Sequence, residues 1–401
     1  MTEWRKRCLG EITSFMSKGI PPKYVERENE NTVRVLNQKC NRNFEINYEE
    51  SRLHDCSKKK VPADKMLQLG DVLINSTGTG TAGRVAQLYD VPTPTTIDGH
   101  MILLRPTEEI DSIYYGYAVK AFQPKIETLA EGSTGQTEIN RKRLQEEIVI
   151  SFPEEKETQE RIARFLWNID EKIKVNGKIN KKLEQQAEAI FQSILSNAVT
   201  TVNLGEIADV KGGKRLPKGV NLIDIQNTHP YIRVRDLNNV LFASLTPDYA
   251  YVDEETQKSI SRYIVSTGDV LISIVGTIGL TAIVDSTLDK ANLTENCVKV
   301  TNLKHITPEY LLLYLRSQLG REAITKGTVG AVQQKLPIKN IQAIPIPLLS
   351  EKDKNTLLCT LDSIFAEISI NVIQSAKLSS LRDTLLPRLM SGELDVSDID
   401  L

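Results

Sequence analysis

The sequence predicts an α+β protein with two mixed α/β globular domains, related by pseudo-two-fold symmetry and separated by two long helices in an antiparallel coiled coil. Three observations predict this fold: an internal repeat, short strands mixed irregularly with helices, and two extended heptad stripes. The repeat opens each half, where the Leu-Gly-Glu-Ile run at Leu9 recurs at Leu204, 195 residues later. Because this period is as long as a whole domain, we expect two similar domains rather than a solenoid.

The repeat continues through the chain and gives the segment boundaries. Tyr115 matches Tyr310 at the same offset, and the Gly-Asp-Val-Leu-Ile run at Gly70 recurs at Gly268 after a slip of 3 residues. We expect a first globular domain over residues 1–153, a long helix over 154–199, a second globular domain over 200–348, a second long helix over 349–391 and an acidic tail over 392–401.

Short strands bounded by Gly, Pro or Asp dominate the globular segments. A helical pattern at Pro308–Gln318 interrupts them, without the regular βαβ alternation of a doubly wound fold, so the pattern favours α+β. The predicted strands are Asp71–Asn75, His100–Leu104, Ile148–Phe152, Tyr231–Val234, Asp269–Val275, Cys297–Val300 and Ile344–Ile346.

Two stripes of apolar residues in steps of 4 and 3 predict the long helices, each about 40 residues and therefore about 60 Å long. Both stripes are apolar at their ends and polar in the middle, and a helix packed on its own domain is the alternative interpretation. Their seam residues are Ile162, Leu166, Ile169, Ile173, Asn176 and Leu183 in the first helix, and Leu357, Leu361, Ile364, Ile368, Asn371 and Leu378 in the second. Seam asparagines cost stability but fix the register of two helices.

Composition excludes several classes of protein. No apolar run approaches the roughly 18 residues that span a bilayer, and no apolar stretch follows the N-terminal charges, so we expect neither a membrane segment nor a signal peptide. Five cysteines without a CxxC pair indicate reduced thiols, and a cytoplasmic location. The net charge is −2, but residues 1–60 hold 13 Lys or Arg against 9 Asp or Glu, so local basic surfaces are possible.

The motifs of common catalytic centres are absent. The sequence has no Walker A, HExxH or GxSxG motif and no amino-methyltransferase element, so we predict a non-catalytic chain without a cofactor of its own. The GxGxxG pattern of Gly78, Gly80 and Gly83 is not followed by a helical pattern and is better explained as a β-turn. Cys40, His54 and Cys56 have side chains that can bind a metal, but the sequence suggests no fourth ligand, so we predict no metal site.

Polar, Gly-containing loops at matching places in both halves are the remaining candidates for function. Lys and Arg on such loops suit phosphate contact, and Gln, Asn and Arg suit base edges, although ordinary solvated turns have the same composition. The candidate DNA-binding residues are Lys18, Lys23, Arg34, Thr77, Thr79, Gln136, Arg141, Lys211, Lys214, Arg215, Lys218, Arg233, Arg235, Thr277, Gln333 and Gln334.

In this order of motifs, the chain resembles the specificity subunits of type I restriction-modification systems. The resemblance rests on the Leu-Gly-Glu-Ile openings, the two Gly-Asp-Val-Leu-Ile strands with Gly-Thr turns, the loops at Gly132 and Gly327, and the long helices that follow them. It implies two target recognition domains that each read one half of a bipartite site in double-stranded DNA. It also implies helices that set the spacer and dock two modification subunits, with restriction subunits in the full complex. S-adenosylmethionine, ATP and Mg are then expected on partner subunits only.

Two alternatives stay open at this point. A stand-alone DNA-binding regulator with two modules would bind its site tightly without partners. A coiled-coil scaffold for protein interactions would lack a steeply salt-dependent affinity for DNA.

Overall fold

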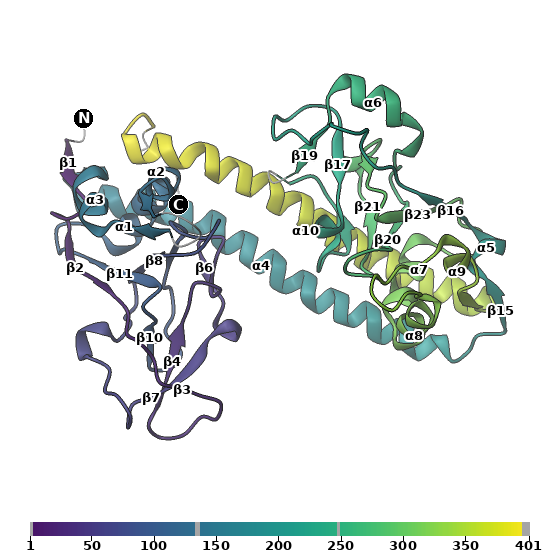
Figure 1. Ribbon diagram of the computed structural model, residues 1–401, viewed down its shortest axis with the longest axis horizontal. Helices are drawn as coiled ribbons and strands as arrows, with labels where there is room; N and C mark the ends of the chain where they lie inside the picture. The colour runs from purple at the N-terminus through teal and green to yellow at the C-terminus, as the bar shows by residue number, and fades with distance from the viewer. Residues whose placement is uncertain (1–2, 133–136, 247–248, 395–401) are drawn as a thin grey trace. The chain divides into compact units, whose positions relative to one another are not determined.

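The computed structural model describes residues 3–132, 137–246 and 249–394. It divides into two compact units, residues 1–172 with 378–401, and residues 173–377. Each unit contains one globular domain and a part of each of two long helices, α4 (Lys156–Leu195) and α10 (Glu351–Ser391), which lie side by side within the unit (Figure 1). The predicted α+β class is confirmed: two mixed-sheet domains are joined by two long antiparallel helices in contact.

The domain of unit 1 has a four-stranded sheet in the order β2-β11-β8-β9 and a second one in the order β10-β4-β7-β3. Its strands are β1 (Trp4–Cys8), β2 (Thr13–Lys18), β3 (Tyr24–Val25), β4 (Thr32–Leu36), β5 (Asn41–Arg42), β6 (Glu45–Ile46), β7 (Arg52–Asp55), β8 (Val72–Asn75), β9 (Val85–Gln87), β10 (Thr95–Ile97), β11 (Met101–Pro106), β12 (Ala130–Glu131), β13 (Glu138–Ile139) and β14 (Val149–Pro153). Its short helices are α1 (Ser112–Ala121), α2 (Gln123–Glu127) and α3 (Arg141–Glu147).

The domain of unit 2 repeats this topology. Its sheet order β16-β23-β20-β21-β18 begins like that of unit 1, and β19-β17-β22 forms the second sheet. Its strands are β15 (Thr200–Asn203), β16 (Asp209–Gly212), β17 (Pro230–Ile232), β18 (Phe242–Ala243), β19 (Ala250–Tyr251), β20 (Val270–Ser273), β21 (Thr281–Val284), β22 (Asn292–Leu293), β23 (Cys297–Thr301) and β24 (Pro345–Leu348). Its short helices are α5 (Leu204–Ile207), α6 (Glu254–Ile260), α7 (Pro308–Arg316), α8 (Gln318–Gly327) and α9 (Ile338–Gln342).

The repeated Gly-Asp-Val-Leu-Ile motif forms the central strands β8 and β20, whose residues are all buried. The aspartate at the start of each strand closes the preceding turn by accepting a backbone hydrogen bond. Each aspartate also pairs with a cation of the neighbouring strand: Asp71 with Arg105 at 2.7 Å and Asp269 with Lys299 at 3.4 Å. The motif is therefore structural, because it fixes the strand that carries the following Gly-Thr turn.

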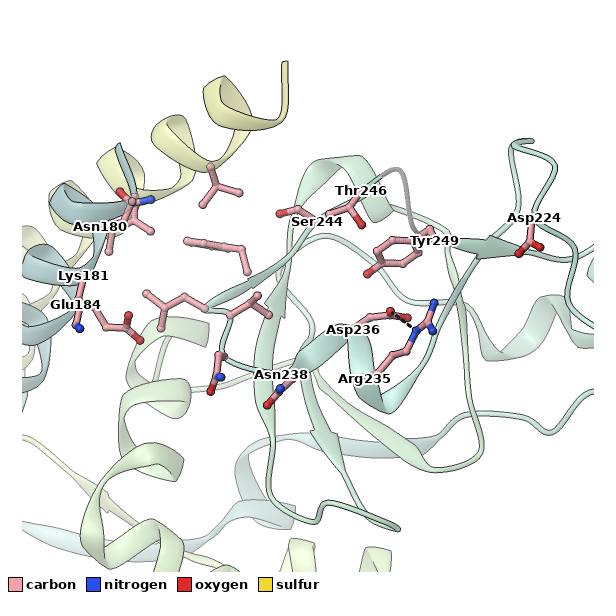
Figure 2. Close-up of a pocket in the computed structure, with 17 residues that line it drawn as sticks. Asn180, Lys181, Glu184, Asp224, Arg235, Asp236, Asn238, Ser244, Thr246 and Tyr249 are labelled. Atoms are coloured by element: carbon pink, nitrogen blue, oxygen red, sulfur yellow. Dashed lines mark ion pairs between the residues drawn. The ribbon is translucent and has the colours of Figure 1, made fainter. Parts of the chain in front are cut away.

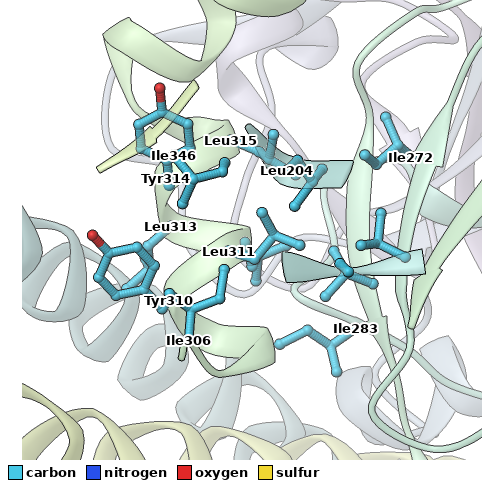
Figure 3. Packing of buried hydrophobic residues seen from close by; sticks show 14 of the residues in the cluster. Leu204, Ile272, Ile283, Ile306, Tyr310, Leu311, Leu313, Tyr314, Leu315 and Ile346 are labelled. Atoms are coloured by element: carbon cyan, nitrogen blue, oxygen red, sulfur yellow. The ribbon is translucent and has the colours of Figure 1, made fainter. Parts of the chain in front are cut away.

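Helix α7 covers one face of the sheet of unit 2 with a continuous apolar surface (Figure 3). Leu311, Leu313 and Leu315 are at most 2% exposed. The hydroxyls of Tyr310 and Tyr314 donate hydrogen bonds of 2.6 Å to the carbonyls of Pro347 and Pro345 in β24. This packing ties the sheet to the strand that leads into helix α10.

The polar middle of the predicted seam lies within unit 2. Asn176 donates to the side chains of Gln374 at 2.9 Å and Ser375 at 3.2 Å, and Asn371 donates to Asn180 at 2.9 Å. The numbering rises along one helix as it falls along the other, so the helices are antiparallel. These hydrogen bonds occur only in one alignment of the helices, as expected for polar seam residues.

The apolar ends of the seam are shared with the domain cores. Ile162, Leu166 and Ile169 of unit 1 are at most 7% exposed, and Ile162 and Leu166 belong to the domain core. Leu357, Leu361, Ile364 and Ile368 are buried in the core of unit 2, whereas Ile173, Leu183 and Leu378 are half-buried. The stripes therefore pack on their own domains as well as along the helix pair.

Helix α10 corrects the expectation that no segment is long and apolar enough to span a bilayer. It contains an 18-residue window of mean hydropathy 1.5, which by length and composition alone suffices to cross a membrane. Counting uninterrupted apolar runs misses this window, because charged residues interrupt it. Within this helix, Leu357, Leu361, Ile364, Phe365 and Ile368 are buried in the core of unit 2.

The first long helix, predicted over 154–199, ends at Leu195, and β15 begins at Thr200 and pairs with β24 in antiparallel register. The predicted strand Tyr231–Val234 ends at Ile232, and a 3-10 turn begins at Val234. The other predicted strands and the helix at Pro308 are confirmed to within two residues at each end.

Candidate nucleic-acid interface

In each unit, a glycine allows the chain to cross from the central sheet to the second sheet. An ideal Cβ on Gly19 would lie 2.1 Å from the carbonyl oxygen of Ile97, and one on Gly213 would lie 2.0 Å from that of Thr294. The next residues, Ile20 and Lys214, donate backbone hydrogen bonds of 2.9 and 2.8 Å to that neighbouring strand. The crossing places the loops that follow, residues 20–23 and 214–219, at one end of each sheet.

The Gly-Thr turn meets this same end, together with the segment after Gly327 in unit 2 and, in unit 1, the described end of the matching loop at residues 137–139. In unit 1, Ser76 donates its N–H to His100 and accepts from Ile139, both at 2.8 Å. In unit 2, Ile274 donates to Asn296 at 2.8 Å and accepts from Leu336 at 3.0 Å. Three loops from distant parts of the sequence therefore converge in each unit, and we call this convergence the loop cluster.

Several predicted residues of unit 1 lie in its loop cluster. Lys18 forms an ion pair with Glu138, and Thr77 shares a hydrogen bond of 2.9 Å with His100. Thr79 and Lys23 are exposed beside them. This cluster thus offers hydroxyl and imidazole groups as well as cations.

Three other predicted residues of this unit lie elsewhere or are not described. Arg141 is exposed at the start of α3, soon after the loop that begins at Gly132. Arg34 lies on β4 of the second sheet and donates to Ser51 at 3.1 Å. Gln136 and most of the acidic tail lie outside the described residues.

The basic loop of unit 2 is partly engaged by acidic side chains. Arg215 pairs with Glu295 at 2.8 Å, and Lys211 pairs with Asp209 at 3.0 Å. Partial burial disfavours the charge on Glu295, but hydrogen bonds from Arg215, Thr294 and its own backbone, together with the charge of Arg215, outweigh burial and lower the pKa of that carboxyl. Lys214 lies 5.3 Å from the ring centre of Tyr263, and Lys218 is exposed.

The remaining predicted residues of unit 2 separate into two groups. Thr277, Gln333 and Gln334 are exposed in the loop cluster. Arg233 and Arg235 instead pair with Asp236 at 3.0 and 3.6 Å, outside the three loops. The structure therefore brings together most of the predicted loop residues but not the arginines at 233 and 235.

Arg235 lines a groove of about 1330 Å³ in unit 2, bounded by helices α4 and α10, by residues between Arg235 and Thr246, and by Tyr249 (Figure 2). No residue of the loop cluster lines this groove. The hydroxyl of Tyr249 is buried at its edge without a hydrogen-bond partner among the described residues. The groove mixes polar and apolar side chains, so its composition does not select one chemical class of ligand.

Two of the three residues that offered metal-ligand types, His54 and Cys40, are buried in the fold. The buried ring of His54 accepts the N–H of Lys23 at one nitrogen and contacts the carbonyl of Lys59 at 2.7 Å with the other. Cys40 is fully buried, and this burial raises the pKa of its thiol to about 11. Within the described ranges, no group of His, Cys, Asp and Glu is arranged to hold a metal ion.

Sequence reasoning missed His100, Glu295 and Asn296, which lie inside the loop clusters. All three lie within two residues of the start of strand β11 or β23, and that position was the available signal. Their placement depends on backbone contacts with turns more than 20 residues away, which no local pattern displays.

The fold and the two loop clusters define a two-module binding protein, and comparison with known proteins identifies its family. The model of the type I restriction modification DNA specificity domain matches residues 1–185 and 197–377. The chain therefore belongs to this family and is a DNA specificity subunit of a type I restriction-modification system, which confirms the predicted resemblance and the non-catalytic role.

Individual relatives are distant in sequence. The chain is 21% identical to the type I restriction enzyme HindI specificity subunit of Haemophilus influenzae, over 98% of this chain and all of that subunit. It is 23% identical to the EcoBI specificity subunit of Escherichia coli, over 54% of this chain and only 45% of that subunit. The crystal structure of the type I S subunit from M. genitalium shares the fold with a TM-score of 0.56 and 19% identity, over 97% of this chain and 96% of that one.

Proposed function

We propose that each unit reads one half of a bipartite site in double-stranded DNA through its loop cluster. The observation that carries this proposal is the convergence of three polar loops at the same topological place in both units. A rigid sheet end that presents cations and amide side chains offers both phosphate contacts and base-edge contacts. The two clusters differ in composition, as readers of two different half-sites should.

In this proposal, the positively charged side chains of the loop clusters have two different roles. Lys23 and Lys218 are exposed, and in the described part of the chain neither belongs to an ion pair, so they are suited to phosphates. Arg215 and Lys18 are held by acidic partners, so DNA would have to compete with those carboxylates for them. We therefore expect Lys23 and Lys218 to contribute affinity for DNA of any sequence. The cations that are paired with carboxylates should instead orient the domain on the DNA.

The long helices support a spacer role. Helix α4 has 40 residues and α10 has 41, so each is about 60 Å long, which exceeds one turn of B-DNA at roughly 34–36 Å. We propose that the helices set the spacer and dock two modification subunits, with restriction subunits in the full complex in the cytoplasm. S-adenosylmethionine, ATP and Mg then belong to those partners.

Removing the cations of the unit 2 loop tests the DNA interface. We expect the combined change of Lys214, Arg215 and Lys218 to Ala to weaken DNA binding by the complex with modification subunits. The salt dependence should become shallower by about 0.9 in log–log slope for each lost phosphate contact. Fluorescence anisotropy at several salt concentrations measures both quantities.

Lys304 supplies the matched control, because it is exposed beyond the opposite end of β23. Lys304→Ala should leave affinity and slope unchanged. If the triple variant also leaves both unchanged, this loop is not part of the interface. The family assignment decides against a stand-alone regulator and a protein scaffold as the class of this chain.

A further inference from the structure

The loop after Gly327 in unit 2 is a short, rigid hairpin, which we call the apex hairpin (Val329–Lys335). Val329 and Lys335 exchange two backbone hydrogen bonds of 2.9 Å and close its base. Lys335 also bridges to Val275 of the Gly-Thr turn, and the next residue, Leu336, is fully buried in the domain core. The hairpin is therefore fixed to the central sheet and belongs to the loop cluster.

The conformation of the hairpin depends on one glycine. Gly330 has a φ of 104°, and an ideal Cβ there would lie 2.3 Å from the carbonyl oxygen of Gln333. Only glycine adopts this backbone without strain. The turn is thus built to hold the residues between Gly330 and Lys335 in one arrangement.

The apex carries an apolar side chain where solvent would favour a polar one. Val332 is 97% exposed, the largest exposed fraction among the large apolar side chains in the described part of the chain. Gln333 and Gln334 beside it are exposed as well. A β-branched side chain has few rotamers, so little side-chain entropy is lost when it makes a contact.

We propose that Val332 is a specificity-determining residue that contacts the 5-methyl group of a thymine in the half-site read by unit 2. This inference rests on the proposed function. The thymine methyl is the apolar group that a base pair exposes in the major groove, and amide side chains beside it match the adenine edge. A valine followed by two exposed glutamines, on a hairpin fixed to the loop cluster, matches this combination of groups.

Polar alternatives fit the apex less well. A phosphate contact would favour a cation or a hydroxyl, and a purely structural turn would not need an apolar residue without contacts. Lone apolar residues do occur on protein surfaces. Val332 differs from these because it stands near the tip of a closed hairpin, next to Gln333 and Gln334, in the cluster that holds the basic loop.

Replacing thymine by deoxyuridine removes only the methyl group and tests the contact directly. The complex with modification subunits is titrated with DNA in which each thymine of the half-site is replaced in turn. At one position we expect the wild-type complex to lose about fourfold in affinity, the factor that corresponds to burial of one methyl group. Val332→Ala should lose a similar factor on thymine DNA and show no further loss on deoxyuridine DNA, whereas Val332→Ile should retain the preference for thymine.

Leu319→Ala is the matched control, because Leu319 is 56% exposed at the opposite end of helix α8 and should not affect the preference. The inference is overturned if no thymine position is sensitive, if the half-site has no thymine, or if Val332→Ala remains as sensitive as the wild type. In those cases specific binding persists and the proposed function stands. Loss of all specific binding by the wild-type complex would instead contradict the proposed function itself.

Discussion

The two units share one topology but fix their domains to the long helices with different chemistry. In unit 1, Asp170 of helix α4 accepts hydrogen bonds from Arg382 of helix α10 at 2.5 Å and from Tyr117 of helix α1 at 2.7 Å. Lys120 of α1 lies 4.0 Å from the same carboxylate, and all three charged side chains are at most 20% exposed. One buried carboxylate thus holds a domain helix and both long helices together.

Unit 2 uses aromatic packing and a more exposed ion pair at the corresponding junction. Phe242 of the domain packs edge-on against Phe365 of helix α10 at 6.1 Å between ring centres. Arg316 of α7 pairs with Glu184 of α4 at 2.9 Å, where the two side chains are 21% and 34% exposed. Arg316 also donates to the carbonyls of Val240 and Thr281, so it does not depend on the carboxylate.

This difference shows that the two halves of the repeat share their topology but not the contacts that fix each domain to the long helices. A buried carboxylate shared by two cations cannot be removed without leaving buried charge unpaired. A half-buried pair whose arginine also donates to backbone carbonyls costs less to break, because the guanidinium keeps those hydrogen bonds. We therefore expect the two junctions to respond differently to matched substitutions.

Removal of the carboxylate should show the largest difference. Asp170→Ala should destabilise unit 1 by about 3 kcal/mol, because Lys120 and the hydroxyl of Tyr117 would lose this carboxylate and Arg382 would keep only Asp383 as an acidic partner. Glu184→Ala should destabilise unit 2 by at most about 1 kcal/mol. Hydrogen exchange of the full chain, followed separately in peptides of each unit, measures both effects. Equal losses in the two units would refute the contrast.

The crossing glycines should respond alike in the two units, unlike the two junctions. Gly19→Ala and Gly213→Ala each push a methyl group against a backbone carbonyl, so each should cost about 3 kcal/mol in its own unit. The same exchange experiment reads out this effect. A large loss in one unit with none in the other would mean that the crossings are not equivalent.

A smaller effect should follow from pH. Burial lowers the pKa of Lys120 to about 8 from its usual 10.5, although Asp170 opposes the shift. The unfolded chain therefore binds a proton that the folded chain has released between about pH 8 and 10.5, so stability gains there as pH rises.

Relative to Lys120→Met, the wild-type chain should thus become more stable from pH 8 to 10, by at most about 1.4 kcal/mol per pH unit. Below pH 8 the difference between the two chains should be constant. Denaturant unfolding of both chains across this range provides the measurement, and a difference that does not change between pH 8 and 10 would show that Lys120 keeps its proton.

The sequence predicts the repeated elements well, because their signals are local. The buried strands β8 and β20 are β-branched runs after Gly-Asp turns, and the long helices follow from heptad spacing. Apart from β17, the strands of the second sheets were missed because they are two to five residues long and pair over long range, as in the parallel pairing of Thr95 with Arg34. The heptad stripe also does not reveal that its apolar ends enter the domain cores.

The candidate interface was predictable only in its parts. The polar loops are visible in the sequence, but their convergence depends on hydrogen bonds such as that between Ser76 and Ile139. The engagement of Arg215 by Glu295 joins residues 80 positions apart, so the sequence overstates the free charge of that loop. Arg235 matches the expected residue type but lines the groove instead of the loop cluster.

The claim that each unit reads its own half-site is tested most directly by exchanging one domain. Residues 1–153 are replaced by the corresponding domain of a related specificity subunit with a different target, and the complex with modification subunits is expressed in a host. Sequencing of adenine methylation then gives the recognised motif. We predict that one half of the motif changes, while the other half and the spacer length stay constant. A folded, active graft that changes both halves would contradict separate reading by the two units.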